Sequence, residues 1–556
     1  MPSAVVVGGG PAGLAAALAL HQNGWGALVV EGSPPPPTAA PSGSASSGPP
    51  SSDLAWYRPS VPQAQQSHTF TSLGVRTLRR RAPAVLDALL AAGAEMFDLT
   101  TSMPQHAADS ARQPQDDELV ALACRRTTFE LVLHRYVAAL PRVRIRYLTQ
   151  VVGVTLASDR PVVSGVVTKT GDVLSADVVI DATGRRAASR AWLDAAGHPV
   201  GEDLASPSGV TGFTRFYRLS GSRRPGPLNR GHAAGDVFDH YAGVLHPGDG
   251  GTFSIAIGTL PGDRELSALR TPAGFTAAAE ATPWLSPWLA DGVSVPISPV
   301  RALACPPNAL RAAATTPVVA GLYPVGDAAC VTNPLFGRGM SLAMAHAFEL
   351  ADLLAAHPAA DQAQADTAAG LADALYRPWY EHAVLADQAR TAQWRMAITQ
   401  ISGPIDADGA SDTAGTGNTA STRNTADAPG ADSTDSTGRA TDAANAAKST
   451  DSAADSAPPP AALQPGRPSP RAVLAAAATD ATVWRGMTRM AMTLSTPGEV
   501  FADEAFTSRV ARASAAATPN RLNRPSPPTR AALVNAVAMA TQASEALEPA
   551  QPRIGA

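Results

Sequence analysis

Lysine and cysteine are the two rarest residues of this 556-residue chain. The lysines are Lys169 and Lys448, so arginine supplies nearly all of the positive charge, and the net charge is −4. A chain so close to neutral has no basic surface for a polyanion, and we expect no nucleic-acid partner. The cysteines Cys124, Cys305 and Cys330 form no CxxC pair. They therefore predict neither a disulfide framework nor a metal site, and they fit a reducing compartment.

An uninterrupted apolar run long enough to span a membrane is also missing. The stretch from Ala4 to Val30 has the length, but glycines and His21, Gln22 and Asn23 interrupt it. The first predicted strand starts about three residues after the initiator Met, which leaves no room for a signal peptide. We expect a cytoplasmic protein without a transmembrane segment.

Three segments have little capacity to form a core. Residues 33–53 are rich in Pro, Ser and Gly, and residues 403–470 are rich in Ala, Thr, Ser, Asp and Gly. Neither segment can bury enough apolar surface to offset its chain entropy, so we predict disorder in both. The tail 515–556 is predicted to be mostly disordered, with one possible helix at Arg530–Leu547.

The remaining sequence alternates between strand and helix patterns. "AVVVGGG", "AGLAAALALHQNG" and "GALVVEG" read as strand, helix and strand, which predicts a βαβ unit with a parallel sheet. Further strands are predicted in "VRIRYLTQVVGVTLA", where alternation suggests an antiparallel sheet with one wet face, and in "PVVSGVVTKTGDVLSA" and "ADVVIDATG". Residues 209–219 and 251–260 predict a separate sheet, and residues 370–398 a long helix.

The first chemical motif is G-x-G-x-x-G at Gly8, Gly10 and Gly13, between a strand and a helix. These glycines permit a tight turn, close approach of a pyrophosphate and close packing of helix on strand. The helix N-terminus would bind the phosphates. Glu31 ends the next strand, where its carboxylate can accept hydrogen bonds from a ribose. The motif predicts a dinucleotide and leaves NAD and FAD open.

Two later stretches distinguish these cofactors: "ADVVIDATGRRAASR" (176–190) and "YPVGDAACVTNPLFGRGMSLAMAHA" (323–347). With the N-terminal glycines, they resemble in order and spacing the three fingerprints of flavin-dependent monooxygenases of the aromatic-hydroxylase type. The resemblance implies that Asp327 binds the flavin ribitol and that the following helix points its N-terminus at the isoalloxazine ring. Bare N–H groups there would stabilise the negative charge of reduced flavin.

Upstream, "RPSVPQAQQSHTF" (58–70) and "CRRTTFE" (124–130) resemble the bacterial branch of these flavoproteins that is related to squalene epoxidase and prenyl reductases. Arg58, Gln63, His68 and Arg126 match that branch. The resemblance implies that Arg126 contacts FAD and that Arg58 and His68 lie near the flavin or pyrophosphate. These two are the candidate catalytic residues, although His68 can equally be a loop histidine with a structural hydrogen bond. The implied FAD-binding residues are Gly8, Gly10, Pro11, Ala12, Gly13, Glu31, Arg126, Gly184, Gly326, Asp327, Pro334, Gly337, Gly339 and Met340.

The middle fingerprint departs from the hydroxylase pattern. Thr183-Gly184 replaces Asp-Gly, and Ala187 stands where a Ser is usual. Because Asp-Gly is associated with NADPH as well as FAD, this departure weakens direct NADPH use. NADPH or NADH would then bind transiently, or electrons would come through a separate reductase.

The resemblance implies an α/β fold: a Rossmann-like FAD-binding domain of the GR2 flavoprotein type, a mixed or antiparallel substrate domain, and C-terminal helices. We expect the chain to contribute to these parts as follows: FAD-binding domain 1–73, 118–192 and 312–402; substrate domain 74–117 and 193–311; disordered insert 403–470; helices 471–514; tail 515–556.

The implied reaction is hydroxylation or epoxidation of a lipophilic small molecule through a flavin hydroperoxide, which needs a dry pocket more than an acid–base triad. Candidates to line that pocket are Phe213, Phe216, Tyr217 and Phe253, with Trp284 and Trp288 also considered; each can equally be a plain core residue. The alternatives are a prenyl-type reductase, a non-catalytic flavin-binding module and a halogenase. The sequence does not favour halogenation, since neither lysine is well placed and no Trp-x-Trp-x-Ile-Pro segment occurs.

Overall fold

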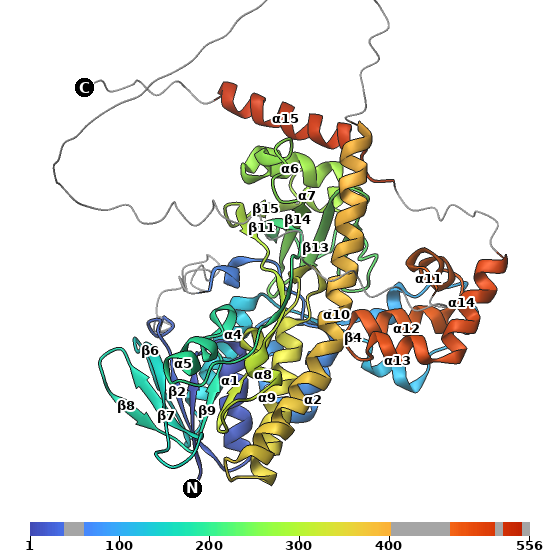
Figure 1. Cartoon of the computed structure of the whole chain (residues 1–556). Helices are drawn as coiled ribbons and strands as arrows, with labels where there is room; N and C mark the ends of the chain where they lie inside the picture. Colours follow the sequence, from blue (N-terminus) through green and yellow to red (C-terminus); the bar gives the residue numbers. More distant parts are fainter. Residues whose placement is uncertain (38–60, 402–467, 517–525, 548–556) are drawn as a thin grey trace, which may run out of the picture. The chain divides into compact units, whose positions relative to one another are not determined.

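A five-stranded parallel sheet organises the N-terminal part of the fold (Figure 1). The computed structural model describes residues 1–37, 61–401, 468–516 and 526–547, which all belong to one unit. The strand order places the first strand of the chain in the middle, and all four neighbouring pairs are parallel. In spatial order the strands are β18 (Leu322–Pro324), β9 (Val178–Asp181), β1 (Ser3–Val7), β2 (Gly26–Val30) and β5 (Val143–Arg146).

Both faces of this sheet are covered, as its nearly continuous valine content requires. In β1, Ala4 and Val6 point into the core beneath the helices, whereas Val5 and Val7 point into a second core on the opposite face. The first face packs on α1 (Pro11–Gln22), α2 (Ser72–Arg81), α3 (Pro83–Ala91), α4 (Arg126–Ala138) and α9 (Gly339–Ala356). The second packs on α5 (Ser189–Ala195) and on the three-stranded sheet β6 (Val151–Leu156), β7 (Val163–Thr168) and β8 (Val173–Ser175).

The prediction for residues 143–157 was half wrong. The second half, β6, pairs antiparallel with β7 as expected. The first half, β5, instead joins the parallel sheet beside β2, with Val29 opposite Ile145. Because β5 is the edge strand, part of it stays exposed, and this produces the same alternation as a one-sided antiparallel strand.

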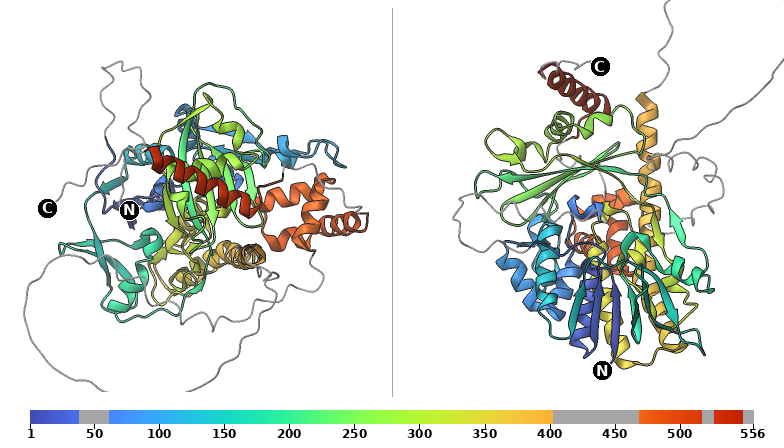
Figure 2. Two further views of the ribbon diagram at one scale, coloured as in Figure 1. Left: turned by 90° about the horizontal axis from the view of Figure 1, so that it is seen from above. Right: turned by 90° about the vertical axis from the view of Figure 1, so that its left-hand side faces the viewer.

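A second, antiparallel sheet forms from residues 211–304, as the sequence predicted for 209–219 and 251–260. Its central pair aligns Phe213 with Ile257 and Phe216 with Ser254. The outer face packs on α6 (Pro272–Ala281), α7 (Ser286–Leu289) and α15 (Arg530–Leu547) (Figure 2). The strands are β12 (Ala234–Val237), β13 (Ala242–Pro247), β14 (Thr252–Thr259), β11 (Thr211–Leu219), β15 (Ser294–Pro296) and β16 (Arg301–Ala304).

Short elements connect the two large sheets. A hairpin-like pair joins β3 (Glu95–Asp98) to β4 (Val120–Ala123), and a small sheet contains β10 (Leu204–Ser206), β17 (Asn308–Leu310) and β19 (Cys330–Val331). The helix α8 (Ala312–Thr315) follows β17. Short 3-10 turns occur at η2 (Pro62–Gln65), η3 (Leu99–Ser102), η4 (Pro114–Glu118), η5 (Gly184–Arg186), η6 (Ser267–Arg270), η7 (Gly326–Ala328) and η8 (Pro334–Phe336).

The long helix α10 (Gln362–Ile401) contacts both parts of the fold. It exceeds the predicted 370–398 at both ends and continues through Pro378. Its first half packs on α9, and further along Trp394 donates a hydrogen bond from Nε1 to the carbonyl of Phe238 at 2.8 Å, beside the antiparallel sheet. The helix therefore ties the sheet to the domain that holds the first motif.

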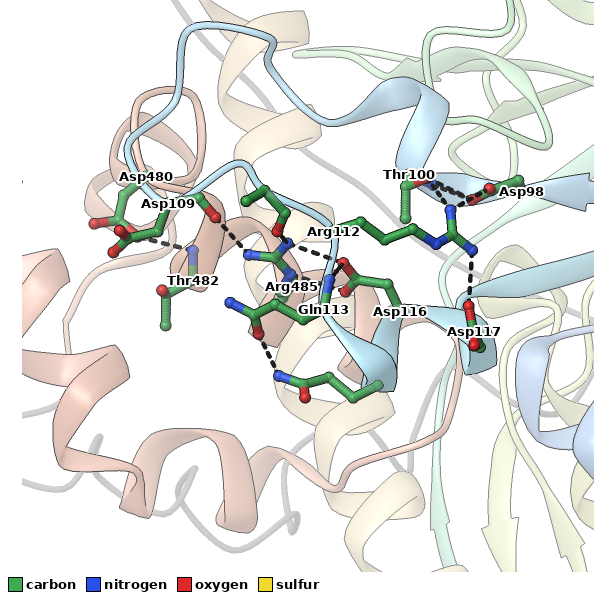
Figure 3. A network of polar contacts seen from close by, with 12 residues as sticks. Asp98, Thr100, Asp109, Arg112, Gln113, Asp116, Asp117, Asp480, Thr482 and Arg485 are labelled. Carbon is green, nitrogen blue, oxygen red and sulfur yellow. Dashed lines mark hydrogen bonds and ion pairs between the residues drawn. The ribbon is translucent and has the colours of Figure 1, made fainter.

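The C-terminal helices dock on residues 98–118 through a buried ion pair (Figure 3). Arg485, 4 % exposed, donates to both carboxylate oxygens of Asp116, at 2.8 and 2.9 Å, and to the carbonyls of Asp109 and Ala111. Such a pair strongly specifies the docked position because either charge alone would be costly to bury. The helices are α11 (Pro470–Ala477), α12 (Ala481–Ala491), α13 (Pro497–Ala502) and α14 (Glu504–Ala516).

The low-complexity predictions fall mostly outside the described residues. That is the case for 38–53 of the first segment and for 403–467 of the second. Residues 468–470 are described, and Ser469 accepts a hydrogen bond from the amide of Ala472 at the start of α11. The helix predicted in the tail is confirmed as α15, where Arg530 pairs with Asp263 and Glu265 and where Leu533 and Val537 are buried.

Candidate functional site

The glycines of the first motif form a tight turn at the carboxyl end of β1. Gly8 has a φ of +114°, and a Cβ there would lie 2.3 Å from the carbonyl oxygen of Ala182. A Cβ on Gly13 would lie 1.9 Å from the oxygen of Gly8. Gly10 differs, because no protein atom lies within 4 Å of its Cβ position, and the residue lines a cleft. The first and third glycines are thus required by the protein itself, whereas the second leaves space in the cleft.

Glu31 is buried behind this turn, with 7 % exposure. Its Oε2 accepts a hydrogen bond from the amide of Gly9 at 2.8 Å, and Oε1 accepts one from the amide of Ser33 at 2.7 Å. The carboxylate thus holds the glycine turn against the end of β2. It also lines the cleft, where the sequence places it for a ribose.

The middle fingerprint forms the turn after β9. Asp181 is fully buried and accepts hydrogen bonds from the amide of Thr183 at 2.9 Å and from the amide and hydroxyl of Ser189 at 2.8 and 2.5 Å. Ser189, two residues beyond Ala187, therefore supplies a hydroxyl to this turn. Gly184 has a φ of +68° and lines the cleft, with no protein atom within 4 Å of its Cβ position.

The third fingerprint brings residues 326–340 against the first. Gly326 has a φ of +63°, and a Cβ there would lie 2.8 Å from the Cβ of Ala12 in α1. The carboxylate of Asp327 is about one-third exposed and lies 3.8 Å from Nε of Arg185. Asp327, Gly339 and Met340 all line the cleft. Strands and helices more than three hundred residues apart therefore share one site.

The loop before α9 is fixed by tight contacts. Gly337 adopts a left-handed conformation with φ +64°, and a Cβ there would meet Cβ of Thr69 at 2.8 Å. Asn333 accepts a hydrogen bond from the amide of Leu335 at 3.0 Å and donates to Asp387 at 2.7 Å. Pro334 begins the η8 turn between them. Pro334 and Gly337 do not line the cleft with Gly339, so they shape it from behind.

Arg126 enters the cleft from the start of α4, and His68 lies behind it. Arg126 donates from Nε to Glu130 at 2.6 Å and from Nη1 to Nε2 of His68 at 3.1 Å. On the other side of the ring, Nδ1 of His68 donates to the carbonyl of Gln66 at 2.8 Å. These two contacts define a neutral imidazole, and burial together with Arg126 lowers the pKa of His68 to about 3. His68 therefore orients Arg126 and does not line the cleft itself.

The cleft as a whole has a volume of about 670 Å³. Of the fourteen residues implied for FAD, eleven line it: Gly8, Gly10, Pro11, Ala12, Glu31, Arg126, Gly184, Gly326, Asp327, Gly339 and Met340. Gly13, Pro334 and Gly337 lie outside its lining. Arg58 lies outside the described residues, and the structure gives no placement for it.

Arg185 and Arg186 line the cleft but were not among the predicted site residues, and Arg185 is the one that faces Asp327. Burial lowers the pKa of its guanidinium, and its Nε is buried without a hydrogen-bond partner, facing Asp327 at 3.8 Å. The available signal was the pair of arginines directly after Gly184. An arginine at the turn after a parallel strand is at the edge of the sheet where cofactors bind.

The candidate substrate residues divide between the two faces of the antiparallel sheet. Phe213, Tyr217 and Phe253 lie in the outer core with α6, α7 and α15, so the plain-core interpretation fits them, and it fits Trp284 and Trp288 as well. Phe216 points to the opposite, inner face, beside Ser254. Ser254 is bonded to Ser67 of the loop that leads to His68, at 2.9 Å. Phe216 alone among the four remains a candidate for a substrate pocket.

The residues present fit a bound FAD. No protein atom lies within 4 Å of the Cβ positions of Gly10 and Gly184, which both line the cleft, as a closely approaching pyrophosphate requires. Two guanidinium groups, of Arg126 and Arg185, and the N-terminus of α1 supply positive charge for the phosphates, and Asp327 supplies an acceptor for a ribitol. Among the described residues, no group of three or more His, Cys, Asp or Glu side chains could hold a metal ion.

Residues 4–204 match the family model of FAD dependent oxidoreductases. Two solved structures are similar across the described fold, each with a TM-score of 0.50. One is PqsL, a probable FAD-dependent monooxygenase from Pseudomonas aeruginosa, at 16 % identity over 72 % of this chain and 99 % of that one. The other is the myxobacterial chondrochloren halogenase CndH, at 17 % identity over 74 % and 92 %.

No curated protein matches the sequence. The structural likenesses show a shared Rossmann-type flavoprotein fold, and the family match of residues 4–204 supports an FAD-dependent oxidoreductase. None of the described helices is both long and apolar enough to cross a membrane.

Proposed function

We propose that the protein is an FAD-dependent monooxygenase that hydroxylates or epoxidises a lipophilic small molecule in the cytoplasm. NADPH or NADH would supply electrons, through transient binding or a separate reductase. The overall reaction joins substrate, O2, NAD(P)H and a proton to give oxygenated substrate, water and NAD(P)+. Bound FAD supplies the redox chemistry with O2; the roles below are those of the protein's own residues.

The observation that carries this proposal is the surface opposite the third fingerprint. Leu335, in the loop before α9, approaches the inner face of the antiparallel sheet, 4.0 Å from the Cβ position of Gly258. It packs there on Val210, Ala242 and Trp394. Further along, Phe216, Thr214 and Val244 continue this inner face with uncharged side chains. A lipophilic substrate suits such a surface, because burial of apolar area drives its binding and excludes water.

The polar groups at this boundary are neutral at physiological pH. His246 and Ser254 lie side by side on the inner face, and Ser67 bonds to both, at 3.0 and 2.9 Å. Burial lowers the pKa of His246 well below its ordinary value. With His68 also neutral, the residues act by positioning and by excluding water, which is what an oxygen transfer asks of a protein.

Halogenation has weaker support. Lys169 is exposed in the turn between β7 and β8 and does not line the cleft, and Lys448 lies outside the described residues.

The epoxidase-like relationship rests on the resemblance of the segments 58–70 and 124–130. Reduction of a prenyl-type alkene is the second candidate reaction, and it rests on the same resemblance. A non-catalytic flavin module would bind FAD without turnover.

One experiment separates these outcomes. The purified full chain is supplied with FAD, NADPH or NADH, and lipophilic alkenes and phenols under ¹⁸O2. We expect O2 consumption coupled to substrate and one ¹⁸O atom in the product. Product that gains two hydrogens without O2 would instead establish the reductase, and FAD that no reductant reduces would establish the non-catalytic module.

A further inference from the structure

Arg338 is a buried arginine that has no carboxylate partner among the described residues. It is 3 % exposed, and within the described part of the chain no Asp or Glu oxygen lies in ion-pair distance of its guanidinium. The group stacks between the rings of Phe336 and Trp379, with its central carbon 4.4 and 4.8 Å from their centroids. Its Nη atoms lie 3.4 and 3.5 Å from Nδ1 of His382, and Nε is buried without a hydrogen-bond partner.

The other buried arginines of the described chain show how unusual this is. Each of the four forms a short ion pair: Arg125 with Asp249 at 2.6 Å, Arg390 with Asp387 at 2.8 Å, Arg485 with Asp116 at 2.8 Å, and Arg530 with Asp263 at 2.8 Å. A buried charge without a partner costs free energy that the chain avoids elsewhere. Arg338 bears this cost in free energy, and its cation–π contacts with two aromatic rings offset only part of it.

The positive charge of Arg338 is not cancelled by its surroundings. Cys330 and, to a lesser extent, Asp387 raise the pKa of Arg338. Burial raises the pKa of the Cys330 thiol to about 12, so the thiol stays neutral, and Asp387 is already bonded to Arg390, Asn308 and Asn333, at 2.8, 2.8 and 2.7 Å. Burial lowers the pKa of Arg338 to about 9. The guanidinium therefore stays charged at neutral pH, in surroundings that screen it poorly.

The position of this charge is what links it to the cofactor. Arg338 is the residue directly before α9, between Gly337 and Gly339, and Gly339 and Met340 line the cleft. A helix N-terminus is already positive, so stability alone favours an acidic residue there. Arg338 itself does not line the cleft; its guanidinium lies between Phe336 and Trp379, and its charge adds to the positive potential at the start of α9.

We propose that Arg338 tunes FAD, stabilising its reduced, anionic form relative to the oxidised form and so raising its midpoint potential. Hydride transfer from NAD(P)H to oxidised FAD leaves one negative charge on the reduced flavin, and the guanidinium offsets that charge through the start of α9. Arg338 is a positioning and electrostatic residue with no contact to substrate. This role rests on FAD binding in the cleft and is independent of the proposed oxygen chemistry.

The test measures the midpoint potential of the FAD-loaded full chain against reference dyes, without substrate. Arg338→Met and Arg338→Gln remove the charge, whereas Arg338→Lys keeps the charge and loses the planar fork. We expect the neutral variants to favour reduced over oxidised FAD at least tenfold less than the wild type, a fall of about 30 mV for a two-electron couple. Arg338→Lys should stay close to the wild-type potential. Arg377→Met is the matched control, since Arg377 lies on α10 in a half-exposed pair with Asp373.

The outcomes decide between electrostatic tuning and simple anchoring of the loop. A wild-type potential in Arg338→Met, or an equal fall in the lysine and neutral variants, would overturn the proposal. If both neutral variants lose FAD while Arg338→Lys retains it, the charge is needed for FAD binding as such, and the proposed tuning of the potential is overturned. Loss of FAD from all three variants would assign Arg338 to anchoring alone. A monooxygenase assay that fails in the wild type leaves this measurement unaffected.

Discussion

The FAD cleft and the antiparallel sheet opposite it differ in the chemical groups that they present. The cleft is lined largely by backbone and by glycines, at Gly8, Gly10, Gly184 and Gly326, with a few charged side chains. The antiparallel sheet presents side chains on two faces, an outer one packed on helices and an inner one that meets Leu335 and Ser67. The cleft positions therefore require backbone conformations that few residue types other than glycine can adopt. The positions on the sheet faces require only packing contacts, which many residue types can make.

We expect the largest loss of folding stability from Gly13→Val. A Cβ at this position would lie 1.9 Å from a backbone oxygen of Gly8, and the backbone must move to admit it. We expect more than about 4 kcal/mol of destabilisation, or no folded chain at all, measured by denaturant unfolding. Gly153→Val is the control, because no protein atom lies within 4 Å of its Cβ position. Equal stability of the two variants would contradict this account of the turn.

The two faces of β11 should respond differently to truncation. Phe213→Ala opens a cavity in the outer core and should cost about 3–5 kcal/mol, with FAD content and turnover per bound FAD unchanged. Phe216→Ala on the inner face should change the rate or the preference among lipophilic substrates. Thermal unfolding and turnover, each normalised to bound FAD, provide the measurement. If Phe213→Ala were the variant that altered substrate preference, the assignment of the faces would be wrong.

Gly10→Val should separate cofactor binding from folding. The protein leaves this Cβ position open, so the apoprotein should unfold at the wild-type temperature. The side chain would occupy the space for the pyrophosphate, and we expect FAD affinity to fall about 100-fold, or about 2.7 kcal/mol. Flavin fluorescence titration measures the affinity. Wild-type FAD content in this variant would rule out the cleft as the binding site.

Removal of one charged side chain from the proposed flavin end of the cleft should weaken FAD binding moderately. Asp327→Asn removes the charge beside Arg185, and we expect about tenfold weaker FAD binding, about 1.4 kcal/mol. Arg185→Met should weaken binding by a similar factor. Asp373→Asn, on the exposed surface of α10, serves as the control. FAD affinity that is insensitive to both cleft variants would argue against their proposed roles.

The smallest expected effect is that of His68 on the stability of the fold at acid pH. The folded pKa of His68 is about 3 and its ordinary value is 6.5, so the unfolded chain binds more protons between these pH values. The contribution of His68 to stability is therefore complete above about pH 6.5 and is lost as the pH falls, by about 1 kcal/mol at pH 5.5. His68→Gln should flatten the pH dependence of the unfolding free energy by this amount. An unchanged slope between pH 5 and 7 would contradict the neutral assignment.

Local motifs predicted much of the cleft because its requirements are local. Gly10, Glu31 and Asp327 each stand at a fixed distance from a strand end, and a strand followed by a helix must place them at one edge of the sheet. Arg185 and Arg186 were both missed because no local pattern marks an arginine after Gly184 as part of the cleft. The edge strand β5 was misread because exposure at a sheet edge and exposure on a sheet face give the same alternation.

The sequence by itself determined the cofactor class, the parallel sheet and the helix at Arg530–Leu547, because these follow from backbone conformation and from periods of a few residues. Only the tertiary structure decided which way Phe213 and Phe216 face, that His68 lies behind Arg126, and that Arg338 has aromatic neighbours and, in the described part of the chain, no acidic partner. Those facts depend on contacts between residues that are far apart in the chain, such as Arg338 with Trp379 or Ser67 with Ser254. No local pattern records such contacts, because long-range packing selects them.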